Sequence, residues 1–138
     1  MSKNSGNFLF LLSPYTNADC QGIAVLLLLP LSRGITMYIM QRFDLEQLCL
    51  NIQRHIITTI YVVPPVVLHL ANHPLIDKYN LSSLRVMHSS AAPLSHDLVR
   101  AAYNRLKVPI KQGYGMTEAS PGIATQVNLP LLYLIHDI

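Results

Sequence analysis

The chain contains no tryptophan, and only 12% of its 138 residues are charged. Its formal net charge of +3 is scattered, without a run of Lys and Arg, so the basic footprint of a nucleic-acid-binding protein is missing. Its two cysteines, Cys20 and Cys49, form no CxxC pair, which indicates a reducing compartment and disfavours a metal site. The most apolar run, Ile23 to Leu31, is shorter than the about 20 residues that cross a bilayer, so we expect no transmembrane segment.

Neither end of the chain carries a clear targeting signal. Phe8 to Leu12 is faintly similar to a signal peptide, but this apolar core is short and no small-residue cleavage site follows closely. The last residues, His136-Asp137-Ile138, are not a peroxisomal signal. We therefore expect a cytoplasmic protein.

Apolar residues make up 51% of the sequence, which favours a folded domain over disorder. Helix and strand patterns alternate, so we predict an α/β fold with a mostly parallel sheet layered with helices. Asp44 and Ser95 are predicted helix N-caps, and Pro65 is predicted to open a further helix. The predicted strands span residues 35–40, 56–63, 84–88 and 108–111, and the predicted helices span 22–31, 45–55, 66–72 and the segment after Ser95.

The most informative segment is Gln112 to Glu118, with the sequence QGYGMTE, which follows the last predicted strand. We expect a glycine-hinged turn at the carboxyl end of that strand, where open α/β sheets bind ligands. Tyr114 offers a flat surface for a purine, Thr117 a hydroxyl for an anion, and Glu118 a hard oxygen for Mg²⁺. The plain alternative is a surface turn.

Two further blocks strengthen this interpretation. Asn80 to Val86 reads NLSSLRV and is followed by Ser89 to Leu94, SSAAPL; upstream, Arg42 to Glu46 reads RFDLE and precedes Tyr61 to Val67. In order and spacing, these blocks and QGYGMTE resemble the adenylate-forming (AMP-binding) superfamily, and most of all its 4-coumarate–CoA ligase-like acyl-CoA synthetases. The resemblance implies part of the large N-terminal domain over residues 22–125, between divergent segments at 1–21 and 126–138.

The resemblance implies specific roles for residues of this chain. Thr117 and Glu118 would be catalytic, Thr117 at the α-phosphate and Glu118 as the Mg²⁺ ligand. The implied nucleotide-binding residues are Ser90, Ala91, Ala92, Pro93, Gln112, Gly113, Tyr114, Gly115, Met116 and Thr117. The implied acyl-pocket residues are His88, Ser89, Gly113, Pro121 and Gly122.

Two positions depart from the family pattern. Ser90 replaces a usual glycine, and serine would be strained there if the position required a positive φ. His88 stands where coumarate ligases commonly have a basic residue, and it is equally well explained as a partly buried strand residue.

The resemblance implies ATP, Mg²⁺ and CoA as cofactors and co-substrates, and a small-molecule carboxylic acid, aromatic or of medium length, in secondary metabolism. The parent enzyme would be cytoplasmic, with a peroxisomal location also possible. The chain lacks the family's Pro-Lys-Gly phosphate loop and its catalytic C-terminal lysine. We therefore expect a truncated acyl-CoA synthetase that is inactive alone. The alternatives are an adenylation domain that loads a carrier protein, a nucleotide- or partner-binding remnant, and a product that does not fold.

Overall fold

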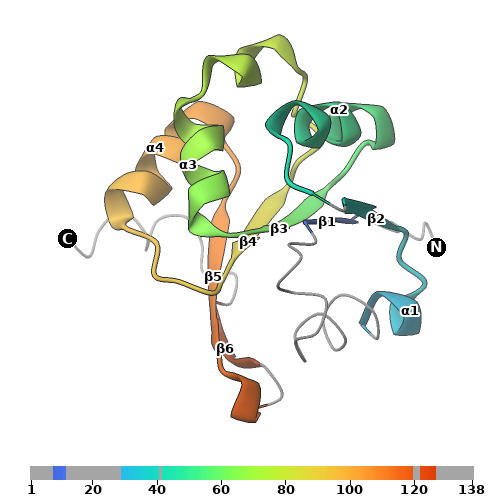
Figure 1. Cartoon of the computed structure of the whole chain (residues 1–138), viewed down its shortest axis with the longest axis vertical. Coiled ribbons are helices and arrows are strands. Elements are labelled where there is room, and N and C mark those ends of the chain that lie inside the picture. The colour runs from blue at the N-terminus through green and yellow to red at the C-terminus, as the bar shows by residue number, and fades with distance from the viewer. Residues whose placement is uncertain (1–7, 12–28, 41, 120–121, 127–138) are drawn as a thin grey trace.

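The computed structural model describes residues 8–11, 29–40, 42–119 and 122–126, and these form a sheet with helices packed on it (Figure 1). The strands are β1 (Phe8–Leu11), β2 (Met37–Met40), β3 (Thr59–Val62), β4 (Val86–Ser89), β5 (Ile110–Gly115) and β6 (Gly122–Thr125). The helices are α1 (Leu29–Arg33), α2 (Leu45–His55), α3 (Pro64–Asn72) and α4 (His96–Leu106), with 3₁₀ turns η2 (Pro74–Lys78) and η3 (Thr117–Ala119).

The sheet has the order β2-β1-β3-β4-β5-β6. Each neighbouring pair from β2 to β5 is parallel, and β6 pairs with β5 in the antiparallel sense. The predicted α/β class with a mostly parallel sheet is therefore confirmed. In such a sheet the carboxyl ends of β4 and β5 lie at the same edge, so the segments that follow them come together.

One face of the sheet holds the core. Ile60, Met87 and Ile110 lie in one row across β3, β4 and β5 and are almost fully buried, because α2, α3 and α4 pack over this face (Figure 1). The helices contribute the buried side chains Leu48, Cys49, Ile52, Val66, Val67, Leu70 and Ala102. Burial, with a smaller effect of Glu46, raises the pKa of the Cys49 thiol to about 11.

The predicted helix starts are confirmed by their hydrogen bonds. An oxygen of the Asp44 carboxylate accepts a bond of 2.8 Å from the backbone N–H of Gln47, and the Ser95 hydroxyl accepts one of 3.3 Å from that of Leu98. Helix α3 begins at Pro64, one residue before the predicted Pro65, where a missing N–H costs nothing. The two side-chain caps mark the starts of α2 and α4, and Pro64 marks the start of α3.

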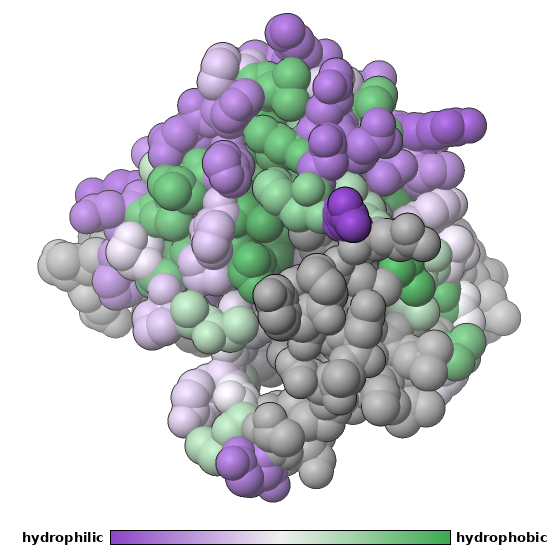
Figure 2. Space-filling view, viewed as in Figure 1, coloured by the Kyte–Doolittle hydropathy of each residue, from purple (hydrophilic) through white to green (hydrophobic). Residues whose placement is uncertain are grey.

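The observed elements differ from the predicted ones in three places. Leu31, expected in a buried helix, is 66% exposed in the short α1; the rest of the predicted 22–31 helix, apart from Leu29 and Pro30, lies outside the described residues. Strand β1 was not predicted, because a four-residue strand between β2 and β3 is fixed by distant partners rather than by local pattern. The predicted last strand extends to Gly115, and β6 follows it; the end of this hairpin protrudes at the lower edge of the molecule (Figure 2).

Candidate functional site

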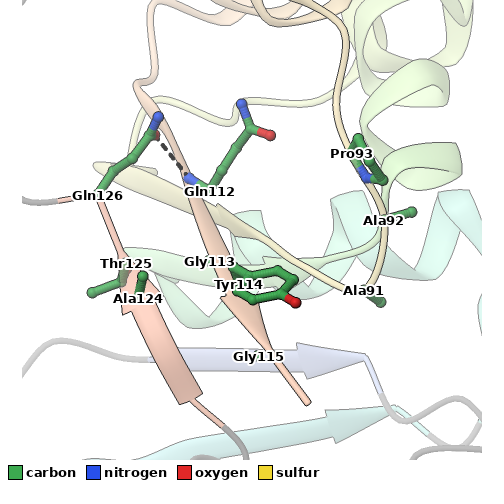
Figure 3. Close-up of a pocket in the computed structure, with 10 residues that line it drawn as sticks. All are labelled: Ala91, Ala92, Pro93, Gln112, Gly113, Tyr114, Gly115, Ala124, Thr125 and Gln126. Carbon is green, nitrogen blue, oxygen red and sulfur yellow. Dashed lines mark hydrogen bonds between the residues drawn. The ribbon is translucent and has the colours of Figure 1, made fainter.

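A cavity of about 510 Å³ opens beside the second half of β5, between the loop after β4 and strand β6 (Figure 3). Its residues come from three segments that are distant in sequence. The loop gives Ala91, Ala92 and Pro93, strand β5 gives Gln112 to Gly115, and the β6 segment gives Ala124, Thr125 and Gln126. Apart from the glutamines, Tyr114 and Thr125, these residues are apolar or glycine, so most of the lining suits the flat face of an organic ligand.

The β5 wall is a strand and not the turn that the sequence predicted. Side chains alternate along it, so Gln112 and Tyr114 project to one side and Gly113 to the other. Tyr114 is 61% exposed, and its ring points from β5 toward the loop that carries Ala91 (Figure 3). A register shift between Tyr114 and Gly115 marks a bulge in the pairing with β6. Bulges re-aim side chains, which is a reason why this ring faces the cavity.

The backbone conformation of Gly113 does not require glycine, because its φ is not positive. Among the described glycines, the one with a positive φ is Gly34. A Cβ atom added at Gly113 would lie 3.8 Å from the carbonyl oxygen of Ala124 and 3.9 Å from the Cβ of Ser90. These are ordinary contact distances. An alanine therefore fits at this position, whereas a larger side chain would have to displace its neighbours.

The loop after β4 carries backbone strain at Ala91. Its φ is +77°, in the region that favours glycine, while Ser90 is not among the described residues with positive φ. The condition under which Ser90 would be strained is therefore not met, and the positive φ lies one residue later, at Ala91. The loop is fixed at its far end by the side chain of Gln112, whose Oε1 accepts a 3.3 Å bond from the backbone N–H of Leu94. A loop held in this way presents its backbone to the cavity at a defined place.

The remaining predicted nucleotide and metal residues lie past the cavity lining. Met116 is 43% exposed, and Thr117 and Glu118 follow it in η3, with the Glu118 side chain exposed. Ser90, half-buried between β4 and the lining loop, does not line the cavity either. The structure thus brings together seven of the predicted nucleotide residues and leaves Ser90 and Met116 beside them, while the side chain of Thr117 lies outside the described part of the structure.

The protein offers only some of the ligands that a magnesium ion would need at this site. The described residues contain no group of three or more His, Cys, Asp or Glu side chains that could hold a metal ion. Glu118 offers one exposed carboxylate. Mg²⁺ usually takes one or two carboxylates and completes its six ligands with water and phosphate oxygens, so a single carboxylate suits a phosphate-bound ion.

The predicted acyl-pocket residues separate onto both faces of the sheet. His88 is half-buried on the face opposite the core, where its ring stacks on that of Tyr61 with centroids 4.7 Å apart. Lys111 is its partner in the register of β4 and β5. Burial, with a smaller effect of Lys111, lowers the pKa of His88 below its ordinary value of 6.5. His88 is therefore neutral at pH 7 and supplies a flat, uncharged surface.

The other acyl-pocket residues lie elsewhere. Ser89 points to the core face, is 2% exposed, and its hydroxyl has no hydrogen-bond partner among the described residues. Gly113 shares the face of Lys111 by strand alternation, and Gly122 begins β6 with open space around it. Pro121 lies outside the described residues. Ser89 and Gly122 do not line the cavity, so the structure does not gather these five residues into one pocket.

The third wall was missed from the sequence. Gln126 was assigned to the divergent tail, yet its backbone N–H donates to the carbonyl oxygen of Gln112 at 3.0 Å, and its side-chain Oε1 accepts from the N–H of Gln112 at 3.0 Å. The signal available was a Pro-Gly pair at 121–122, which is typical of a turn, followed by the β-branched Ile123 and Thr125.

No helix in the part of the chain that the structure describes is long and apolar enough to cross a membrane.

Comparison with known proteins decides the family. The family described as "AMP-binding enzyme" matches residues 11–133. The chain belongs to this family. It is 46% identical over 101 residues to 4-coumarate:CoA ligase 1 of Petunia hybrida, covering 71% of the chain and 18% of that protein. It is equally similar, over 97 residues, to 4-coumarate–CoA ligase 1 of Petroselinum crispum, covering 68% of the chain and 18% of the relative. The chain thus spans less than a fifth of these curated relatives.

Solved structures agree with this assignment. The amide bond synthetase McbA of Marinactinospora thermotolerans superposes with a TM-score of 0.77 at 28% identity, over 90% of the chain and 24% of that protein. A red-emitting luciferase of Phrixothrix hirtus gives 0.72 at 30% identity, over 90% of the chain and 23% of the luciferase. The O-succinylbenzoate CoA synthetase of Bacillus subtilis, solved with ATP and magnesium, gives 0.74 at 23% identity over 91% of the chain and 25% of the synthetase, and supports the fold.

Proposed function

We propose that this chain forms the adenine-nucleotide wall of an acid–CoA ligase of the 4-coumarate–CoA ligase type. The observation that supports the proposal is the cavity itself. Its loop and β5 walls consist of residues that were predicted from the sequence to bind nucleotide. The relatives' names, 4-coumarate–CoA ligases, support the substrate class.

The base is held, in this proposal, between the Tyr114 ring and the loop of Ala91 and Ala92. A purine stacks on an exposed aromatic face, and small side chains let it lie against the backbone. Thr117 and Glu118 lie in η3, beyond the end of β5. In this proposal Thr117 would contact the α-phosphate and Glu118 would hold Mg²⁺. When bound, Mg²⁺ neutralises charge on the phosphate oxygens.

The carboxylic acid lies on the other side of β5. Gly113 lacks the side chain that would separate the two sides, and a neutral His88 stacked on Tyr61 provides a flat, uncharged surface on that side. The parent reaction joins a carboxylate oxygen to the α-phosphorus of ATP and releases pyrophosphate. The acyl group then passes from the adenylate to the thiol of CoA, and AMP leaves. An aromatic or medium-length acid suits this surface.

We expect the 138 residues to bind nucleotide without completing adenylation. In the parent reaction the developing phosphate charge requires cations, and the sequence contains no Pro-Lys-Gly phosphate loop to supply one beside the β- and γ-phosphates. The loss of such groups costs several powers of ten in rate, since removing a single donor already costs about 100- to 1,000-fold.

Two measurements test the proposal. Isothermal titration with AMP, and with UMP as the comparison, should show saturable binding that favours the purine. ATP–pyrophosphate exchange with 4-coumarate should stay at background. Equal binding of AMP and UMP, or none, contradicts the nucleotide assignment. Exchange above background contradicts the inactivity of the isolated chain but supports the ligase chemistry. A chain without a cooperative thermal transition contradicts nucleotide binding by these 138 residues alone.

A further inference from the structure

Gln126 makes a bond that regular strand pairing does not provide. In an antiparallel hydrogen-bonded pair, the two opposed residues exchange both of their backbone N–H···O bonds. Gln126 and Gln112 exchange one of them, at 3.0 Å from the N–H of Gln126 to the oxygen of Gln112. The second is replaced, because the N–H of Gln112 donates at 3.0 Å to the side-chain Oε1 of Gln126 (Figure 3). The side chain thus extends the ladder past Thr125, the last residue of β6.

Gln112 carries this contact across the cavity. Its backbone is bound to Gln126 on the β6 side, and its side-chain Oε1 accepts from the N–H of Leu94 on the other side. Leu94 is buried and directly follows Pro93, the last lining residue of the loop. The two outer walls of the cavity are therefore connected through one residue, and the Tyr114 ring lies between them (Figure 3).

We propose that Gln126 is a positioning residue that fixes the spacing of the two cavity walls around Tyr114. This inference rests on the proposed nucleotide-binding function. Its action is indirect: the amide oxygen of Gln126 orients Gln112, and Gln112 holds the loop at Leu94. A cavity that is pre-organised in this way loses less conformational entropy when a flat ligand binds, and the ligand therefore binds more tightly.

The test compares three variants. Gln126→Ala removes the acceptor, and Gln126→Glu restores an oxygen acceptor at the same distance from the backbone. Gln53→Ala is the matched control, because Gln53 Oε1 likewise accepts a backbone N–H, that of Asn80 at 2.9 Å, but does not line the cavity. Adenosine, which is uncharged, is the titrant for all variants, so that the added carboxylate of Gln126→Glu has little electrostatic effect on it.

We expect Gln126→Ala to bind adenosine about tenfold more weakly, with Gln126→Glu restoring most of the affinity and Gln53→Ala unchanged. Amide hydrogen exchange provides a second readout. In Gln126→Ala, exchange should accelerate at Gln112 and also at Leu94, on the far side of the cavity, and Gln126→Glu should reverse both. A purely local role for Gln126 would leave Leu94 unaffected.

The outcomes separate this inference from the proposed function. Normal adenosine binding by Gln126→Ala, or equal weakening by Gln53→Ala, overturns the positioning role while leaving nucleotide binding intact. If the unmodified chain binds neither adenosine nor AMP, the proposed function fails. Hydrogen exchange then decides alone: unchanged exchange at Leu94 overturns the connection between the walls, and accelerated exchange supports it.

Discussion

Replacing Tyr114 by alanine separates binding from folding more cleanly than other changes at this site. Tyr114 is 61% exposed, so removing its ring leaves the core untouched, and we expect the free energy of unfolding to change by less than about 0.5 kcal/mol. Base stacking on an aromatic side chain contributes about 1–3 kcal/mol. The dissociation constant for AMP should therefore rise by roughly 5- to 150-fold.

The assay is a calorimetric titration with AMP, paired with urea unfolding of the same variants. Tyr114→Phe keeps the ring and should bind within about twofold of the unmodified chain, because stacking does not need the hydroxyl. Phe43→Ala is the control for loss of an exposed ring away from the cavity, since Phe43 is 39% exposed and stacks on His69. Unchanged AMP affinity in Tyr114→Ala, or equal loss in Tyr114→Phe, would refute the stacking argument.

Three further predictions concern stability. Because burial lowers the pKa of His88, the unfolded chain takes up a proton more readily below pH 6.5; urea midpoints should fall between pH 7 and pH 5, and less so in His88→Phe. Ile56 has φ +51° at a helix end and is 66% exposed, so Ile56→Gly should stabilise the chain by about 1 kcal/mol, whereas Ile39→Gly, from an ordinary strand, should destabilise it. Arg105→Ala removes a 2.9 Å bond to the carbonyl oxygen of Ala71 and a 2.8 Å ion pair with the exposed Asp77, and it should lower the free energy of unfolding by about 2 kcal/mol; an unchanged thermal midpoint would contradict a stabilising role of Arg105.

Local chemistry in the sequence predicted helices α2, α3 and α4 well, but not the short α1. Asp44 and Ser95 cap α2 and α4 through their own side chains, and such short-range bonds are visible as sequence patterns. The alternation of these helices with β-branched segments predicted the parallel sheet. Strand β1 was not predicted, because no local pattern within Phe8–Leu11 indicates that this segment pairs with β2 and β3.

The candidate site was predicted on two of its three walls. The small-residue loop after β4 and the glycine-containing β5 segment are each legible in sequence, and both line the cavity. The conformations of these two segments could not be predicted from the sequence. The QGYG segment continues the strand, and the positive φ lies at Ala91 rather than Ser90. The third wall depends on Gln126 reaching Gln112, a contact between side chain and backbone that no sequence period encodes.

The most direct test of the account is a nuclear magnetic resonance titration of the ¹⁵N-labelled chain with AMP. If the nucleotide binds in the proposed cavity, the amide resonances of the lining residues should shift together along one saturation curve; these residues are Ala91, Ala92, Gly113, Tyr114 and Gly115. The amide resonances of helix α2 should not change. Shifts centred elsewhere, or an AMP titration that moves no amide of β5, would contradict the account.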